Sequence, residues 1–145
     1  MPNFNRSMVL AAAAVLMTTA AGHAEEKRTN PDLPFASGPP EQCISLQRID
    51  HSEIVDDQNI LFYMKGDEVY RNYLPHDCPG LSTHDAFMYR TSLSQLCSLD
   101  IVTVLMRMGF NGFTPGASCG LGMFYPVTEQ DVAGLKTSLE DPAAD

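Results

Sequence analysis

Apolar residues fall into short alternating or continuous runs after the first 40 residues, and this pattern predicts strands. Residues 43–48 alternate between apolar and polar side chains, as a half-buried strand does. Residues 60–64 form a continuous apolar run, and residues 69–74 follow after a short turn-like sequence. Together these two runs predict a β-hairpin, which Pro75 ends because proline donates no backbone hydrogen bond.

Three more runs in the second half of the chain predict strands at residues 86–90, 101–108 and 123–125. Residues 101–108 give the strongest prediction, because β-branched side chains are frequent and every second residue is apolar. The apolar residues expected on one face of that strand are Val102, Val104, Met106 and Met108. We expect the glycine-rich stretch 109–122 to be a flexible loop between strands.

One helix is predicted, and it begins near Thr128. Thr128 suits the N-cap and Asp131 stands three residues later, as in a capping box. Val127 and Val132 are placed for a hydrophobic staple. We expect the helix to pack over an edge or open end of the sheet. The predicted fold class is mainly β (α+β): a small antiparallel β-barrel or roll with one C-terminal helix.

The first 24 residues have the layout of a secretory signal peptide. Arg6 gives a positive start, residues 8–21 are apolar, and Gly22-His23-Ala24 offers small residues before a cleavage site after Ala24. The apolar run is short for a membrane span, and no cysteine follows the cleavage site. The sequence therefore predicts a periplasmic or secreted protein with no membrane anchor after signal cleavage.

The rest of the chain divides by composition into three segments. Residues 25–41 are rich in proline and are expected to be a flexible leader outside the core. Residues 42–140 are expected to form a single β-rich domain, and residues 141–145 read as a frayed tail.

All four cysteines of the chain lie within the predicted domain: Cys43, Cys78, Cys97 and Cys119. An even number of cysteines in an exported domain of this size predicts two disulfides. Three pairings are possible, and we favour the nested one, with Cys78–Cys97 inside Cys43–Cys119. Zinc binding is disfavoured because no Cys-x-x-Cys pair is present.

The formal net charge of −9 disfavours two classes of partner. The lysines and arginines are scattered along the chain and form no basic patch. Nucleic-acid binding and docking onto an anionic membrane surface are therefore not expected.

Two groups of residues stand out as candidate sites. Phe110 and Phe113 are aromatic residues in the predicted glycine-rich loop, and such residues often serve recognition. His76, His84 and Asp85 could ligate a metal or act as an acid–base pair. Prolines and a glycine around His76 favour an ordinary exposed turn instead, and an oxidised Cys78 would not be a ligand.

Other chemistry is not indicated. The sequence contains no nucleophile elbow and no dinucleotide fingerprint, and we predict no cofactor. The acidic run Asp56-Asp57-Gln58-Asn59 lacks EF-hand spacing and is expected to be a polar turn before the strand at residue 60. Met106 and Met108 are expected to pack in the core rather than bind copper.

Several short motifs resemble a family of small exported proteobacterial proteins that carry an uncharacterised four-cysteine domain. The motifs, in order, are Cys43-Ile44, Asp56-Asp57-Gln58-Asn59-Ile60-Leu61-Phe62, Tyr70-x-Asn72-x-Leu74, Cys78-Pro79-Gly80-Leu81, Leu96-Cys97-x-x-Asp100-x-Val102, Cys119-x-Leu121-Gly122-x-Phe124 and Pro126-Val127-Thr128. The resemblance implies an exported, disulfide-bearing domain, and it supplies no activity and no catalytic residue.

These observations predict a non-enzymatic binding or interaction module of the cell envelope. Its partner would be an envelope protein or a small ligand. The alternative is a small periplasmic metal-handling protein or enzyme that uses the region from His76 to Asp85.

Overall fold

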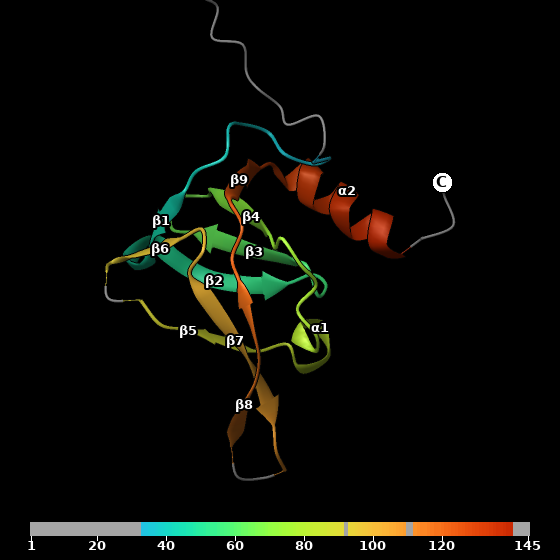
Figure 1. Cartoon of the computed structure of the whole chain (residues 1–145). Coiled ribbons are helices and arrows are strands. Elements are labelled where there is room, and N and C mark those ends of the chain that lie inside the picture. Colours follow the sequence, from blue (N-terminus) through green and yellow to red (C-terminus); the bar gives the residue numbers. More distant parts are fainter. Residues whose placement is uncertain (1–32, 92, 110–111, 141–145) are drawn as a thin grey trace, which may run out of the picture.

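The computed structural model describes residues 33–91, 93–109 and 112–140 of the 145-residue chain. These residues form three antiparallel sheets and one long C-terminal helix (Figure 1). The predicted signal peptide, the first part of the predicted leader and the predicted tail lie outside the described residues. Within the described ranges, no helix is long and apolar enough to cross a membrane.

The largest sheet has four strands in the order β2-β3-β4-β9. They are β2 (Ile49–Ile54), β3 (Asn59–Met64), β4 (Val69–Tyr73) and β9 (Phe124–Val127). The pairing of β3 with β4 confirms the predicted hairpin, and β9 confirms the predicted last strand. Strand β2 was not predicted, because its sequence is mostly polar and its residues are largely exposed.

A second sheet has three strands in the order β5-β7-β8. They are β5 (Phe87–Tyr89), β7 (Ile101–Arg107) and β8 (Phe113–Gly120). Strands β5 and β7 confirm two predictions. The prediction of a loop over residues 109–122 is wrong for β8, which pairs with β7 along its length despite its glycines and Pro115.

Four short elements complete the domain. Strands β1 (Cys43–Ser45) and β6 (Gln95–Cys97) pair with each other. The 3-10 helix η1 (Leu46–Arg48) follows β1, so the strand predicted over residues 43–48 is confirmed only in its first half. Helix α1 (Leu81–His84) was not predicted. The mainly β fold class is confirmed, although the three sheets are not closed into a barrel.

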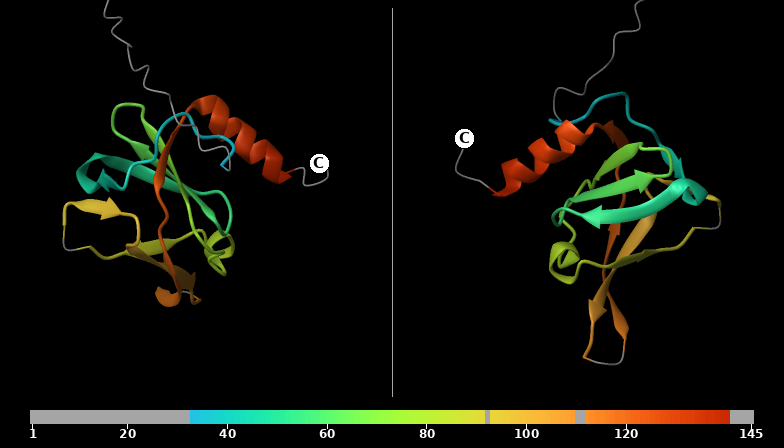
Figure 2. Two further views of the ribbon diagram at one scale, coloured as in Figure 1. Left: turned by 45° about the horizontal axis from the view of Figure 1, so that its top comes forward. Right: turned by 180° about the vertical axis from the view of Figure 1, so that it is seen from behind.

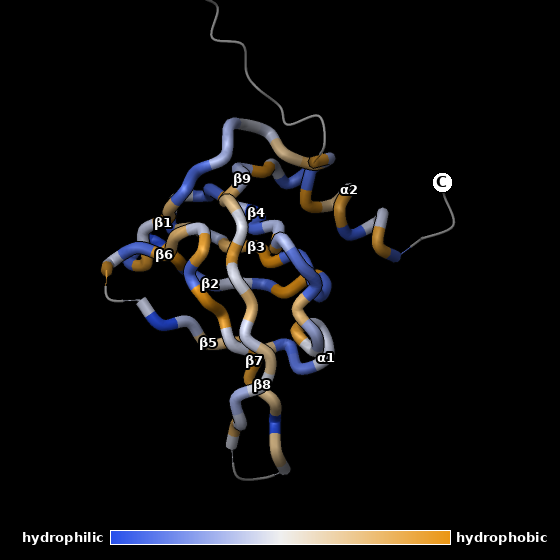
Figure 3. The backbone as a smooth tube through the Cα atoms, viewed as in Figure 1, coloured by the Kyte–Doolittle hydropathy of each residue, from blue (hydrophilic) through white to orange (hydrophobic). Residues whose placement is uncertain are grey.

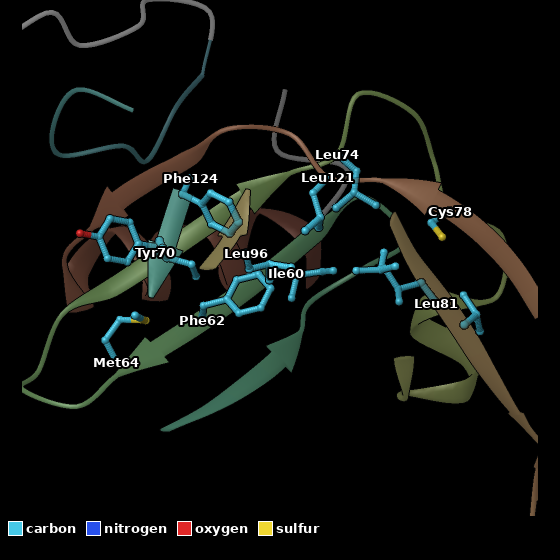
Figure 4. Close-up of a cluster of buried hydrophobic side chains, with 13 residues drawn as sticks. Ile60, Phe62, Met64, Tyr70, Leu74, Cys78, Leu81, Leu96, Leu121 and Phe124 are labelled. Carbon is cyan, nitrogen blue, oxygen red and sulfur yellow. The ribbon is translucent and has the colours of Figure 1, made fainter. Parts of the chain in front are cut away.

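The core lies between the four-stranded and three-stranded sheets (Figure 4). The Phe62 ring is fully buried and makes edge contacts with the rings of Phe87 and Phe124, at 6.3 and 5.6 Å between centroids. Each fully buried side chain of this size stabilises the fold by about 1.5–3 kcal/mol relative to an exposed one. Met106 packs against this core as predicted, but Met108 lies beyond the end of β7 and is 61% exposed, so the core prediction is wrong for it.

Helix α2 (Glu129–Glu140) lies against the other face of the four-stranded sheet (Figure 2). Its buried Leu135 packs with Leu61 of β3 and Val127 of β9. Thr128 and Asp131 form the predicted capping box: the Asp131 carboxylate accepts the Thr128 N–H at 2.8 Å, and Thr128 Oγ1 accepts the Asp131 N–H at 3.2 Å.

Residues 33–41 form a strap across the domain, which we call the N-terminal strap. Leu33 is buried, and the Arg71 guanidinium donates to the Pro34 carbonyl at 2.6 Å. Glu41 and Phe124 exchange two backbone hydrogen bonds. The prediction of a flexible leader outside the core is therefore wrong for residues 33–41, because this part of the chain has backbone and apolar partners on β4 and β9.

The four cysteines form two disulfides, as predicted, but the nested pairing is wrong. Cys43 of β1 is bonded to Cys97, its direct cross-strand partner in β6. Cys78, in the turn after β4, is bonded to Cys119 of β8. Spacing along the chain favoured the shorter Cys78–Cys97 loop, whereas the pairing of β1 with β6 and the position of β8 decide the real partners.

Candidate functional site

The outer face of the β5-β7-β8 sheet, turned away from the core, is the candidate site. Side chains alternate along β7: Val102 and Val104 are buried, and the residues at odd-numbered positions turn outward. We call this outer surface the arginine face and define it by Arg90, Ile101, Thr103, Leu105, Arg107 and Phe113. The hairpin of β7 and β8 extends away from the body of the molecule (Figure 1), and β7 is largely apolar (Figure 3).

Large apolar side chains of the arginine face are open to solvent. Ile101 is 51% exposed and Phe113 is 52% exposed. Beside them lies a shallow hollow of about 330 Å³, whose lining includes Met88, Arg90 and Pro115. A β-bulge in β8 shapes this hollow, because Thr103 pairs with Ser118 while Leu105 pairs with Pro115. The surface is therefore both apolar and contoured.

Arg107 and Phe113 are cross-strand partners on this face. The Arg107 guanidinium carbon lies 5.7 Å from the centroid of the Phe113 ring, and both residues are exposed. A cation–π contact at an exposed site is worth about 0.5–1 kcal/mol. It restrains both side chains while the N–H groups at the edge of the guanidinium stay available to a carboxylate.

Charge is distributed unevenly along the chain, and the arginine face lies in its least acidic part. Residues 86–128 contain one of the 18 acidic residues, Asp100. The Asp100 carboxylate accepts the Cys97 N–H at 2.7 Å, so it is engaged inside the structure. Most of the described arginines and lysines make a hydrogen bond or an ion pair. Among the residues that the structure describes, Arg90 and Arg107 are the two basic residues that make neither. The face therefore carries two unpaired positive charges on an acidic protein.

The sequence identified only part of this surface. Phe113 was singled out and lies on it, at the start of β8 instead of in a loop, and Phe110 lies outside the described residues. Arg90, Ile101 and Arg107 were missed as candidate site residues. Two signals could have found them: the outward-facing positions of the strand at 101–108, and the scarcity of acidic residues over 86–128.

The alternative site from His76 to Asp85 is spread over separate surfaces. His76 lines a hollow of about 220 Å³ beside Cys119, whereas Asp85 lines a different one beside Phe87. His84 ends helix α1. In the described ranges, no group of three or more His, Cys, Asp and Glu side chains could hold a metal ion. The structure therefore does not assemble these residues into one ligand set.

A hollow of about 480 Å³ lies between the β3–β4 turn and the start of α2. Its two tyrosines have structural partners: the Tyr63 hydroxyl donates to Glu53 at 2.9 Å, and the Tyr70 hydroxyl donates to Glu41 at 2.8 Å. Burial and these carboxylates raise the pKa of both tyrosines to about 12. Both side chains are therefore neutral hydrogen-bond donors at ordinary pH.

The acidic run before β3 is the polar turn that the sequence predicts. The Asp56 carboxylate accepts the Gln58 N–H at 2.7 Å. Asp57 Oδ1 accepts the N–H and the hydroxyl of Ser82 at 2.8 and 2.7 Å, and these bonds lower the pKa of Asp57. Both carboxylates therefore bind neighbouring parts of the chain, with Asp57 fixing the start of helix α1.

Comparison with known proteins gives one family match. A model for a family of unknown function matches residues 4–141. Neither the curated proteins nor the solved structures include a match to this chain.

Proposed function

Because the chain belongs to DUF6491, a family of unknown function, its role has to be argued from its own surface, and we propose that it is a non-enzymatic binding module of the cell envelope. The observation that carries the proposal is the arginine face. Exposed apolar side chains and unpaired arginines on one sheet face are typical of a surface that a partner covers.

The use of the titratable side chains supports binding over catalysis. Tyr63 and Tyr70 are engaged with carboxylates, and Asp57 is engaged with Ser82. The pKa values of these three side chains depart from their ordinary range. Among the described residues, the pKa values of Glu53 and of the buried Arg71 are also lowered. Perturbed groups in an active site usually face a ligand, whereas these perturbations arise from contacts that hold the fold together.

Export is the second part of the proposal: we place the mature protein in the periplasm or outside the cell. Residues 1–24 have the layout of a signal peptide, and the family match begins at residue 4, so it includes most of this segment. Two disulfides suit an oxidising compartment. The mass of the protein recovered from the producing cells tests this directly. A chain that starts at Glu25 and lacks four thiol hydrogens is expected, and an uncleaved, reduced chain would refute export.

The binding role is tested by photo-cross-linking in living cells. A photoreactive amino acid replaces Ile101 on the arginine face, and in a matched control it replaces Leu139, an exposed leucine of α2. We expect a discrete cross-linked product from position 101 that is absent from position 139 and is lost when Arg90 and Arg107 become glutamine. No product at position 101, or equal products at both positions, would contradict the proposed binding surface.

A further inference from the structure

We infer that the arginine face binds an extended, acidic segment of a partner protein, in which two carboxylates flank a short apolar stretch. This inference deepens the proposed function and rests on it. It follows from three features of the face: the spacing of its two arginines, the apolar surface between them, and the charge of the rest of the molecule.

The spacing of the arginines sets the length of the segment. Tyr89 of β5 pairs with Val102, so Arg90, the next residue, lies beside Ile101 at one end of β7. Arg107 is at the other end, six positions after Ile101. At about 3.3 Å per residue, the two arginine positions are about 20 Å apart along the strand direction. An extended peptide reaches the same distance with carboxylates six residues apart.

The surface between the arginines suits the side chains of such a peptide. Ile101, Thr103 and Leu105 turn outward along β7, and the hollow beside Met88 and Pro115 offers a depression for an apolar side chain. In an extended peptide, every second side chain faces the same way. The two residues between the carboxylates that share their face would therefore meet this apolar strip.

Recognition would use the sheet face rather than the sheet edge. Strand β8 is an edge strand, and edge strands can add a peptide through backbone hydrogen bonds. Pro115 lacks an N–H group, and the β-bulge beside it interrupts the ladder, so this edge is poorly suited to a further strand. Side chains, and above all the two guanidinium groups, would then carry the specificity.

The charge of the molecule favours an acidic protein segment over a nucleic acid or a lipid surface. Two arginines can neutralise two carboxylates, and guanidinium–carboxylate pairs form strong hydrogen bonds. A phosphate backbone or an anionic bilayer presents many negative charges at once. The remaining surface of a chain with a net charge of −9 would oppose such a broad anion.

A series of labelled peptides tests the inference on the oxidised mature protein by fluorescence anisotropy. The matching probe is Glu-Ser-Val-Ser-Val-Ser-Glu, and control probes have adjacent glutamates or lysines in place of both glutamates. We expect the matching probe to bind about tenfold more tightly than either control, and more weakly as salt is added. Arg90→Gln and Arg107→Gln should each weaken binding about tenfold. Arg48→Gln is the matched control variant, because Arg48 is exposed but already paired with Glu68.

The remaining outcomes separate this inference from the proposed function. Binding that ignores glutamate spacing, or that Arg48→Gln weakens equally, would overturn the inference. If a partner is cross-linked at position 101 but no probe peptide binds, the inference of an acidic segment is overturned, while the proposal of a binding module stands. Absence of both would refute both. Arginine-dependent binding to vesicles of phosphatidylethanolamine and phosphatidylglycerol, without peptide binding, would replace the protein segment by a membrane surface.

Discussion

The buried side chain of Asn72 holds the backbone of Gly122 at both of its polar groups. Its amide nitrogen donates to the Gly122 carbonyl at 2.8 Å, and its oxygen accepts the Gly122 N–H at 2.9 Å. A Cβ atom on Gly122 would lie 1.9 Å from the Tyr73 carbonyl oxygen, so the two chain segments approach too closely for any other residue. This contact joins β4 to the segment between β8 and β9, and it brings together two motifs that are fifty residues apart in the sequence.

Gly122→Ala is therefore expected to lower the free energy of unfolding by more than about 2 kcal/mol, because a backbone clash must be relieved. Asn72→Ala should cost about 1–3 kcal/mol for each Gly122 backbone group that stays buried without a partner. Gly120→Ala is the matched control, since a Cβ there meets no atom within 4 Å. Thermal and urea unfolding measure all three variants. Equal stability of the alanine variants at 120 and 122 would contradict the close approach.

The disulfide pairing can be read from a tryptic digest without reduction. Cleavage after lysine and arginine places each cysteine in a different peptide: residues 29–48, 72–90, 91–107 and 108–136. The structure predicts that 29–48 is joined to 91–107, and that 72–90 is joined to 108–136. Mass spectrometry that finds 72–90 joined to 91–107 would restore the nested pairing instead.

Thr128→Ala should destabilise the protein by about 0.5–2 kcal/mol, because its hydroxyl accepts the Asp131 N–H at the start of α2. Thr128→Ser keeps that acceptor and should behave like the original residue. Asp131→Ala should cost at least as much as Thr128→Ala, because the same carboxylate also accepts the hydroxyl of Ser37 in the N-terminal strap. Urea unfolding of the three variants tests the cap. A Thr128→Ala protein as stable as the original would show that the capping box contributes little.

Stability should fall at high pH because two tyrosines resist ionisation in the folded state. Burial, and the Glu53 and Glu41 carboxylates, raise the pKa of Tyr63 and Tyr70 to about 12. An unfolded tyrosine ionises near pH 10, so this contribution to stability is complete below about pH 10 and is lost as the pH rises toward 12. Tyrosinate absorbance should show a late component near pH 12.

Tyr63→Phe and Tyr70→Phe should each reduce that late component. Glu41→Gln should lower the pKa of Tyr70, since it removes a nearby negative charge but leaves the burial unchanged. A titration of the folded protein that is complete well before pH 12 would contradict the buried hydroxyl–carboxylate contacts.

Elements with a local signature could be predicted from the sequence. The β3–β4 hairpin is a continuous apolar run, a turn and a second run, and α2 has a cap at Thr128. Strand β2 has no such signature: Asp50, His51 and Ser52 are exposed polar residues, and pairing with β3 places this segment in a strand. Strand β8 was not predicted because glycine and proline, here Pro115, are unusual in strands. Its pairing with β7 overrides that preference.

Contacts between distant segments could not be predicted. The partner of Cys43 depends on the pairing of β1 with β6, which no local pattern shows. The strap looked like a leader because it is rich in proline, yet Leu33 is buried and the Pro34 carbonyl accepts a hydrogen bond from Arg71 of β4. The arginine face was visible only in part. Phe113 stood out by its residue type, whereas Arg90 and Arg107 matter because they form no ion pair or hydrogen bond among the described residues.

The two disulfides interleave along the sequence, and this has a consequence for how the protein matures. Neither bond joins neighbouring cysteines: Cys43 reaches past Cys78 to Cys97, and Cys78 reaches past Cys97 to Cys119. A chain that enters an oxidising compartment from its N-terminus presents Cys43 and Cys78 together before either native partner arrives. An oxidant that acts at once would trap the wrong pair, so correct maturation requires either folding before oxidation or a disulfide isomerase that reshuffles the bonds.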